Sequence, residues 1–478
     1  MKKEIKIPIY IKGKYIYNND NFLINDINNS CSLNISKANK WDIEAAIETA
    51  SRTQNKLKDI KKEEISEILR RCSKYFLNED NKNEIISMIT GSPITFIKNS
   101  IEEGKDFCKN SNNFLNNALD KNSIYINSSP TVCILPSNSE IEVPYVLSQI
   151  LLSQNSAIIK PSSRGACSFT AYNFINAWNK ALDEIKNESF PFLSNKNKKE
   201  LSDGFFSPLR NAISIINTNS RDYLEQLSIN KFNYVVFGSE NAINNIEEII
   251  NNNIKNEESY FGPRKIIGYG TGLSKSIVFN DANLKKATTE IMNSVCINTG
   301  NECIGTDIIY VENSIYNKFL NLLKKEGGKY LSGHPLDQNK NGIVTKERLD
   351  YIVDELEIQG KKDYLNLTKK NILNPSIIPI HSMETAQELP GPVVYFRNFS
   401  TEEELIHLIQ KDNVTNKMGK NLVTSIYTSN IEKNKLISNI QTHKIYFNKP
   451  THSIDLQKEN HQGKNLLIEL SDKIDVYK

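Results

Sequence analysis

Residues 131–160 read TVCILPSNSEIEVPYVLSQILLSQNSAIIK, and this stretch decides the fold of the chain. Its two ends, TVCILP at 131–136 and AIIK at 157–160, are short apolar runs typical of buried strands. A strand, a helix and a second strand in this order predict two parallel strands joined by a crossover helix. The helix is indicated by apolar residues at helical spacing: Val143, Val146, Leu147, Ile150 and Leu151.

The alternation of strand and helix continues toward the C-terminus. A helix with apolar positions from Ala171 to Leu182 comes next, and the pattern resumes after a polar insertion near 186–204. Such alternation favours an α/β fold with a doubly wound parallel sheet, in which ligands bind at the carboxyl ends of the strands. The further predicted elements are strand 212–216, a short helix from Ser220, strand 233–237 and a helix from Ser239.

A second alternating unit begins near residue 269, so we expect a second domain there. Before the first sheet, residues 5–17 predict a hairpin or an edge strand, and three helices follow from Trp41 to the stop at Gly91. The elements predicted after 269 are strand 276–279, a helix from Leu284 to Val295, strand 308–311, helix 315–325, strand 393–396, a helix from Thr401, and strands at 445–448 and 466–478.

Polar and small residues follow three of the predicted strands of the first sheet. They are Pro136-Ser137-Asn138, Lys160-Pro161-Ser162-Ser163 and Gly238-Ser239. Because backbone N–H groups at a helix start attract phosphate, three such segments on one sheet edge predict a nucleotide site. The chain has no GxGxxG motif and no Walker loop, and GYGTG at 268–272 lacks the dinucleotide spacing, so we interpret that loop as a hinge.

The segment Asn-Thr-Gly-Asn-Glu-Cys at 298–303 places one thiol, Cys303, after turn-prone residues and behind a helical segment. This position predicts an accessible loop thiol that can act as a nucleophile. Cys296 falls in register with the apolar face of the preceding helix, so we expect it to pack in the core.

Composition bounds the class of protein. The chain has 478 residues, enough for two or three domains, and its net charge of +3 does not indicate a nucleic acid or membrane partner. The basic start lacks the apolar core of a secretory signal, and no apolar run could span a bilayer, so we expect a cytoplasmic protein. The seven cysteines contain no CxxC pair, which favours neither a disulfide framework nor a metal site.

Taken in order, the motifs resemble those of the aldehyde dehydrogenase superfamily along nearly the whole chain. The segments that carry the resemblance are ILPSN at 134–138, IIKPSS at 158–163, VFGS at 236–239, SIVFNDANLKKA at 276–287, NTGNEC at 298–303, IYVENSIYNKFL at 309–320 and ELPGPVV at 388–394.

The resemblance implies an aldehyde dehydrogenase-like α/β fold with three parts. A Rossmann-like NAD(P)-binding domain would cover residues 1–268, with a small oligomerisation flap near 121–131, and a catalytic domain would cover 269–440. Residues 441–478 would form strands that return to the cofactor domain or the oligomer interface. The assembly would be a homodimer or a homotetramer.

The resemblance also implies roles for individual residues. Cys303 would be the nucleophile, and Asn138 would donate its side-chain amide to the oxyanion of the adduct. Lys160 and Glu388 would hold the two cofactor riboses, and Gly238 and Ser239 would lie near the pyrophosphate. The remaining members of the expected cofactor set are Pro136, Ser162, Ser163, Arg164 and Gly272.

Three departures from the family pattern bear on the reaction. Hydrolytic members carry a general-base glutamate where this chain reads Tyr269-Gly270-Thr271-Gly272, which favours the acylating members, the acyl-CoA or fatty acyl thioester reductases. Ser163 and Arg164 replace an acidic ribose contact, which favours NADPH, with NAD as the alternative. Pro390 stands where an aromatic residue often faces the nicotinamide.

We therefore expect an NAD(P)H-dependent enzyme that interconverts an acyl thioester, on coenzyme A or a carrier, and an aldehyde. One alternative is a hydrolytic aldehyde dehydrogenase whose base comes from His452 or His461. The other is a catalytically silent relative that binds nucleotide or a partner protein. The presence of both Cys303 and Asn138 argues against that silent relative.

Overall fold

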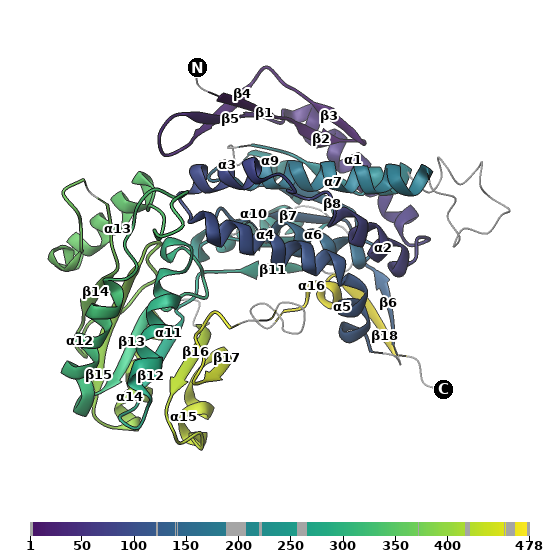
Figure 1. Cartoon of the computed structure of the whole chain (residues 1–478). Helices are drawn as coiled ribbons and strands as arrows, with labels where there is room; N and C mark the ends of the chain where they lie inside the picture. Colours follow the sequence, from purple (N-terminus) through teal and green to yellow (C-terminus); the bar gives the residue numbers. More distant parts are fainter. Residues whose placement is uncertain are drawn as a thin grey trace. The chain divides into compact units, whose positions relative to one another are not determined.

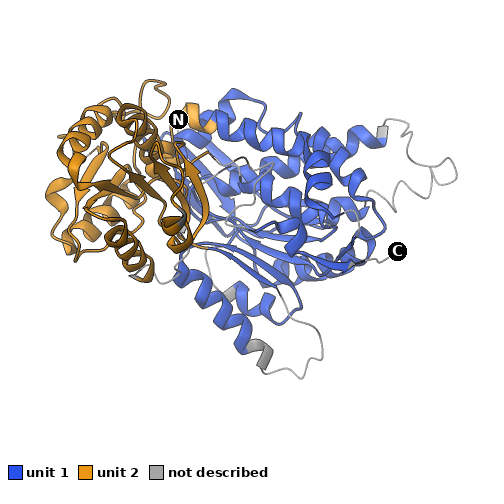
Figure 2. Ribbon diagram, turned by 90° about the horizontal axis from the view of Figure 1, so that it is seen from below, with its two compact units in different colours: residues 1–89, 98–269, 456–478 blue, residues 90–97, 270–455 orange. Residues whose placement is uncertain are grey.

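The computed structural model describes residues 3–120, 123–138, 140, 142–187, 207–218, 222–255, 265–370, 372–415, 421–453, 455 and 464–475. The chain divides into two compact units, shown in Figure 2. Unit 1 holds residues 1–89, 98–269 and 456–478, and unit 2 holds residues 90–97 and 270–455.

Unit 1 is built on a seven-stranded sheet (Figure 1). Its strands, in spatial order, are β11 (Ile266–Tyr269), β10 (Asn233–Phe237), β7 (Thr131–Ile134), β8 (Ala157–Lys160), β9 (Ile213–Ile215), β2 (Ile9–Ile11) and β3 (Lys14–Ile16). The first five are parallel, whereas β2 runs antiparallel to β9 and forms a hairpin with β3. The predicted parallel sheet and the N-terminal hairpin are therefore confirmed.

The decisive stretch forms β7, helix α6 (Glu142–Leu152) and β8, as predicted. Every residue of α6 is buried, which explains why its sequence is apolar around most of the helix. The other helices of the sheet region are α7 (Cys167–Asn187), α9 (Asp222–Ser228) and α10 (Glu240–Lys255). Ser220 and most of the polar insertion near 186–204 lie outside the described residues.

The N-terminal helices α1, α2 and α3 occur where the periodicity predicts them. Helix α1 begins with a capping box, in which Asn39 and Asp42 each accept a backbone N–H of the other. A small sheet of β1 (Lys3–Ile7), β5 (Cys31–Ser36) and β4 (Asn21–Asn25) lies in the same unit. The helix bounds are α1 (Lys40–Leu57), α2 (Lys62–Cys72), α3 (Asp80–Thr90), α4 (Ile94–Lys109) and α5 (Ser111–Ala118).

Unit 2 is built on a six-stranded, all-parallel sheet. Its spatial order is β14 (Ser376–Pro379), β15 (Val393–Phe399), β13 (Ile308–Glu312), β12 (Lys275–Val278), β16 (Asn421–Tyr427) and β17 (Thr442–Phe447). The helical segments are α11 (Leu284–Cys296), η1 (Ile297–Gly300), η2 (Asn313–Ile315), α12 (Tyr316–Gly327), α13 (Lys346–Ile358), η3 (Lys362–Tyr364), α14 (Glu402–Thr415) and α15 (Asn434–Asn439).

The C-terminal segment, expected to return as strands, is divided between the units. Strand β17 pairs with β16 in unit 2, whereas β18 (Ser471–Asp475) pairs with β6 (Ser123–Asn127) in an antiparallel ribbon of unit 1. The prediction of a strand over 466–478 is wrong at its start, because Leu466–Glu469 forms the short helix α16. Asn465 caps this helix by accepting the N–H of Leu467, and its two leucines are buried.

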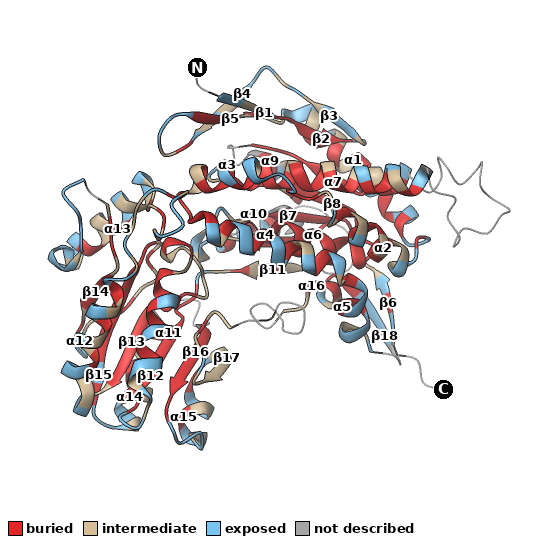
Figure 3. Cartoon of the chain, in the orientation of Figure 1, coloured by how far each residue is buried: buried red, intermediate tan, exposed pale blue. Residues whose placement is uncertain are grey.

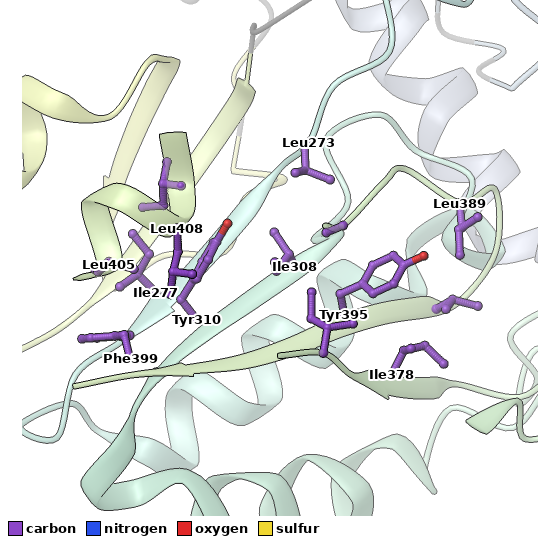
Figure 4. Close-up of a cluster of buried hydrophobic side chains, with 14 of the residues drawn as sticks. Leu273, Ile277, Ile308, Tyr310, Ile378, Leu389, Tyr395, Phe399, Leu405 and Leu408 are labelled. Atoms are coloured by element: carbon purple, nitrogen blue, oxygen red, sulfur yellow. The ribbon is translucent and has the colours of Figure 1, made fainter. Parts of the chain in front are cut away.

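The central strands β12, β13 and β15 of the unit 2 sheet are buried along most of their length and are red in Figure 3, whereas the edge strand β17 is partly exposed. Along β15 the side chains alternate, so that Val393 and Tyr395 join one core cluster and Val394 and Phe396 join another. Figure 4 shows the first cluster, in which Leu405 and Leu408 of α14 lie beside the sheet. Cys296 belongs to the second cluster and is buried, which confirms its predicted packing role.

No helix in the described part of the chain is long and apolar enough to cross a membrane.

A buried ion pair lies within unit 2. Arg397 of β15 and Asp412 of α14 are 1% and 0% exposed, and Arg397 Nη1 lies 3.2 Å from Asp412 Oδ2. Asp412 also accepts hydrogen bonds from the Tyr310 hydroxyl and from the backbone N–H of Ala386 at 3.1 Å. The carboxylate therefore satisfies three donors inside the core.

We expect Asp412→Ala to lower the free energy of unfolding by about 3–5 kcal/mol, because the Arg397 guanidinium would remain buried without its carboxylate. Urea unfolding of the variant and the wild type measures the difference. The double variant Arg397→Met with Asp412→Leu removes both charges and should lose less. Equal losses in the single and double variants would contradict this role of the pair.

Candidate active site

In unit 1, three segments of the predicted site follow adjacent parallel strands. Residues 136–138 lie after β7, Lys160 ends β8 and is followed by residues 161–164, and Gly238 and Ser239 follow β10. Since β10, β7 and β8 are neighbours and parallel, their carboxyl ends meet at one edge of the sheet. The structure therefore brings these unit 1 residues to one edge.

The loops after β7 and β8 are in direct contact. Gly165 has φ +65°, and a Cβ on it would lie 2.8 Å from the carbonyl oxygen of Ser137. Only glycine permits this backbone at such a close approach. Within the loop after β8, the Arg164 N–H donates to Ser162 Oγ at 3.2 Å, and the Arg164 side chain is exposed.

Lys160 is a partly buried cation at this edge. Burial lowers the pKa of its ammonium, and the nearby Cys167 opposes that shift. Among the described residues no hydrogen bond or ion pair to its Nζ is observed, so the ammonium is available to an anionic or hydroxyl-bearing ligand. These properties fit a residue that holds part of a dinucleotide.

Gly238 and Ser239 immediately precede α10. Ser239 Oγ accepts the N–H of Ala242 at 3.3 Å, and the Gly238 N–H donates to the Tyr269 carbonyl at 3.1 Å. The N-terminus of a helix carries partial positive charge, so this turn suits a pyrophosphate.

Tyr269 is the first residue of the segment 269–272, where the resemblance leads us to expect a general base and the chain has no carboxylate. It is 3% exposed at the end of β11, and its ring stacks on Phe237 with centroids 4.5 Å apart. Burial raises the pKa of its phenol well above 10, and the nearby Tyr145 and Glu142 raise it further. A phenol in this state is a poor proton acceptor near neutral pH.

In unit 2, the segment before Cys303 has an uncommon backbone. Helix α11 ends at Cys296, and Asn298, Thr299 and Gly300 then adopt left-handed conformations with φ of 48°, 58° and 67°. Such a φ is rare for a β-branched residue such as Thr299 and costs about 1–3 kcal/mol. The Thr299 hydroxyl is also buried without a hydrogen-bond partner among the described residues.

The left-handed turn 298–300 packs backbone against backbone on the 390–392 loop. A Cβ on Gly300 would lie 2.1 Å from the carbonyl carbon of Gly391 and 2.3 Å from Pro392 N. No side chain fits in that space, so the contact requires glycine at 300, and the φ of this residue also favours glycine. The thiol loop and the ELPGP segment therefore have a fixed contact.

Arg348 of α13 joins the same two segments. Its Nε donates to the Pro390 carbonyl at 2.8 Å, and its Nη2 donates to the Thr299 carbonyl at 3.1 Å. Burial lowers the pKa of the guanidinium to about 9, and the nearby Glu302 carboxylate opposes that shift. Glu302 in turn accepts a hydrogen bond from Asn298 Nδ2 at 2.7 Å.

Cys303 differs from the other cysteines in its exposure. It is partly exposed, whereas Cys31, Cys72, Cys108, Cys133, Cys167 and Cys296 are all buried. Its carbonyl accepts a hydrogen bond from Ser274 Oγ at 3.2 Å. The thiol is therefore neither sealed in the core nor on a freely exposed chain end.

Two carboxyl groups bind the segment that contains Ser274. Glu388 Oε2 accepts the Gly272 N–H at 2.9 Å, and Asp307 Oδ2 accepts the Ser274 N–H at 2.7 Å. The residue between these donors, Leu273, and the residue after Glu388, Leu389, both lie in the core cluster of Figure 4. Residues of this hydrogen-bond network and residues of the core cluster thus alternate along both segments.

Both carboxyl groups hold protons more tightly than usual. Burial raises the pKa of Glu388 to about 7, and the hydrogen bond from Gly272 opposes that shift. Burial also raises the pKa of Asp307 well above its usual range, and the negative charge of Glu388 raises it further. Two negative carboxylates close together in a buried site repel each other, so the pair retains a proton more readily than a single exposed carboxyl group does.

Several residues that contact the Cys303 loop or the segment of Ser274 were not predicted from the sequence. Ser274, Asp307 and Arg348 carry no motif of their own, although Asp307 lies only four residues beyond the predicted nucleophile. The predicted Gly272 and Glu388 are brought together, and the Gly272 N–H donates to the Glu388 carboxyl group.

His461, one of the two histidines considered as an alternative base, lies outside the described residues. The other, His452, is partly buried, and burial lowers its pKa. No metal-ligating group of three or more residues occurs in the described part of the chain.

The chain is thus an α/β protein of two units, each with parallel strands in its main sheet. Polar residues lie at three strand ends of unit 1, and one partly exposed thiol lies on a loop of unit 2. Residues 18–198 and 210–464 match the model of the aldehyde dehydrogenase family, and the chain belongs to that family. The predicted aldehyde dehydrogenase-like fold is therefore confirmed.

Curated relatives match a limited part of the chain. The 3-sulfolactaldehyde dehydrogenase of Priestia aryabhattai is 30% identical over 148 residues, which cover 28% of this chain and 30% of that protein. Aldehyde dehydrogenase 1A1 of Rattus norvegicus is 30% identical over 148 residues, which cover 28% of this chain and 29% of that protein. The matched region thus spans less than a third of the length of either relative.

Solved structures match over nearly the whole chain. HpcC from Thermus thermophilus has a TM-score of 0.80 at 13% identity and covers 98% of this chain and 92% of its own. Glyceraldehyde-3-phosphate dehydrogenase GapN from Methanocaldococcus jannaschii, complexed with NADP, has a TM-score of 0.78 at 17% identity and covers 96% of this chain and 99% of its own. At these identities the likeness shows the fold.

We expect Glu388→Gln to stabilise the protein at alkaline pH. A folded pKa raised from 4.5 to about 7 gives stability that is complete below about pH 4.5 and lost as pH rises through 7. The glutamine variant lacks that loss, so its advantage should reach about 1–3 kcal/mol at pH 8 and vanish near pH 4.5.

Thermal unfolding midpoints across this pH range measure the effect. Glu347→Gln, at an exposed position in the first turn of α13, is the matched control and should follow the wild type. A Glu388→Gln advantage that is constant with pH would show that the carboxyl group does not titrate as described.

Proposed function

We propose that this chain is an NAD(P)H-dependent oxidoreductase that interconverts an acyl thioester and an aldehyde through a covalent thioester on Cys303. The observation that carries the proposal is Tyr269, a buried and stacked phenol at the position where hydrolytic members of the family carry a glutamate. Without a base there, water is a poor nucleophile toward an acyl-enzyme, whereas a thiol needs less assistance.

In the reductive direction the Cys303 thiolate attacks the acyl carbonyl, and the donor thiol leaves with a proton. The nicotinamide, when bound, supplies the hydride that reduces the acyl group. The resulting thiohemiacetal releases the aldehyde and restores the thiol. The proposal assigns Asn138 to the oxyanion, with an effect of about 3 kcal/mol for such a donor.

The proposal places the cofactor on the strand ends of unit 1. Lys160 would hold a ribose, and the start of α10 at Gly238 and Ser239 would hold the pyrophosphate. Ser162, Ser163 and the exposed Arg164 offer hydroxyl groups and a cation where NAD-specific relatives carry an acidic residue, which supports NADPH over NAD. Pro136, Gly272 and Glu388 are the remaining members of the proposed cofactor set.

The proposal also includes a homo-oligomer. The β6–β18 ribbon carries Ile124, Ile126 and Ile474, which are 54%, 40% and 48% exposed. In the antiparallel register Ile124 lies opposite Ile474, so these side chains share one face. Covering this apolar face with a second copy, as a homodimer or homotetramer, would remove it from water.

A second candidate function is the hydrolytic oxidation of aldehydes. The observation that favours it is the Asp307 and Glu388 pair, because a carboxyl group with a pKa of about 7 can accept a proton near neutral pH. The two curated relatives described above are both aldehyde dehydrogenases, which also favours it.

To test the proposal, we expect acyl-CoA substrates of graded chain length to oxidise NADPH, and Cys303→Ala to reduce that rate at least about 1000-fold. Absorbance of NADPH measures the rate. Cys31→Ala, a buried cysteine of β5 in unit 1, is the control and should keep the wild-type rate. Turnover that survives in Cys303→Ala would exclude the assigned nucleophile.

We expect Tyr269→Glu to increase the release of free acid from the acyl-enzyme about tenfold or more, because it restores a carboxyl group at the vacant base position. Quantifying acid and aldehyde from the same reaction measures the partition. Tyr269→Phe keeps the stacked ring without the hydroxyl and should not change the partition. An unchanged partition in Tyr269→Glu would favour the hydrolytic candidate, whose base lies elsewhere.

A further inference from the structure

The left-handed turn 298–300 contains two unfavourable features whose cause is not local. Thr299 is 0% exposed, adopts φ 58°, and keeps a buried hydroxyl without a partner among the described residues. A conformation of this kind persists only where the surroundings determine it. Contacts on this turn come from α13, from the 390–392 loop and from Gly342, where a Cβ would lie 2.9 Å from Thr299 Oγ1.

Helix α13 contacts these segments through one face. Arg348 and Ile352 are four residues apart, so they lie on the same side of the helix. Ile352 is 0% exposed in the core cluster, and its Cδ1 would lie 2.5 Å from a Cβ on Gly391. The helix is thus anchored by Ile352 one turn away from the guanidinium.

The guanidinium binds one carbonyl from each segment. Its donors reach Pro390 O at 2.8 Å and Thr299 O at 3.1 Å, while Nη1 is buried without a partner among the described residues. A planar fork with fixed donors can set the spacing of two carbonyls, which a flexible ammonium cannot. Beside these carbonyls, Gly300 rests on Gly391 with no space for a Cβ.

We infer that Arg348 is a positioning residue for the reaction: it holds the turn before Cys303 and the loop after Glu388 in one fixed frame. This inference rests on the proposed role of Cys303 as the nucleophile. In this frame, the position of the thiol and that of the Glu388 carboxyl group are set together. Loss of the guanidinium would release both segments at once.

The first test requires no substrate. In Arg348→Ala we expect the backbone amides of 298–303, Leu389 and Gly391 to exchange hydrogen about tenfold faster than in the wild type, and millimolar guanidinium to reverse this. Amides of β12 and β15 should not change. Faster exchange in only one segment, or in neither, would overturn the inference.

The second test uses turnover. Arg348→Ala and Arg348→Lys should lower kcat about 10- to 100-fold with little change in the KM of the acyl thioester, because the thiol is misplaced rather than the substrate unbound. Guanidinium should restore part of the kcat of Arg348→Ala and none of that of Arg348→Lys, whose ammonium occupies the site. Lys346→Ala, exposed on the same helix, should behave as the wild type.

The outcomes separate this inference from the proposed function. A wild-type kcat in both Arg348 variants would overturn the inference even if acyl reduction is confirmed. If no acyl thioester is reduced by the wild type, the exchange measurement still decides whether Arg348 couples the two segments. If Arg348→Ala does not fold, exchange and turnover in Arg348→Lys decide it.

Discussion

The contact between the backbones of Gly300 and Gly391 constrains the candidate site of unit 2 more than any side chain does. A Cβ at position 300 would lie 2.1 Å from the Gly391 carbonyl carbon, so the two segments approach as closely as polypeptide permits. This approach forces the left-handed turn that contains Thr299 and leads to Cys303. A strained turn persists only where the surrounding packing holds it, and the buried Leu389 and Ile352 belong to the core next to the 390–392 loop.

A second constraint is the placement of charge inside unit 2. Glu388 and Asp307 accept N–H groups two residues apart, on either side of the buried Leu273. Lys275 is 0% exposed in the same segment, and burial lowers its pKa to about 7, with Asp412 and Asp307 opposing the shift. Each of these groups costs free energy to bury, and buried groups with shifted pKa values are common at functional sites.

Much of the fold could be predicted because its periodicity is strong. The β7–α6–β8 unit and four strands of the second sheet, β12, β13, β15 and β17, are apolar enough to be recognised, whereas β14 and β16 were not predicted. Cys296 could be separated from Cys303 by its register in α11. The four-residue helix α16 could not, since a short apolar run such as Leu466 and Leu467 fits a strand as well. The pairing of β2 with β9 also depends on contacts far apart in sequence.

The site was predictable only where a motif marks it. Arg348 lies on a separate helix with no distinctive neighbours, and Thr299 adopts a conformation that its side chain disfavours, so local propensity points away from it. Both belong to the part of the structure where tertiary contacts override local preference.

The burial of six cysteines and the partial exposure of the seventh have a practical consequence. A maleimide fluorophore added to the native protein would attach at one position without any engineering of the chain. That position adjoins the most constrained turn of unit 2, so the dye would serve as a built-in reporter of events at the loop, and its stoichiometry would count competent molecules in a preparation.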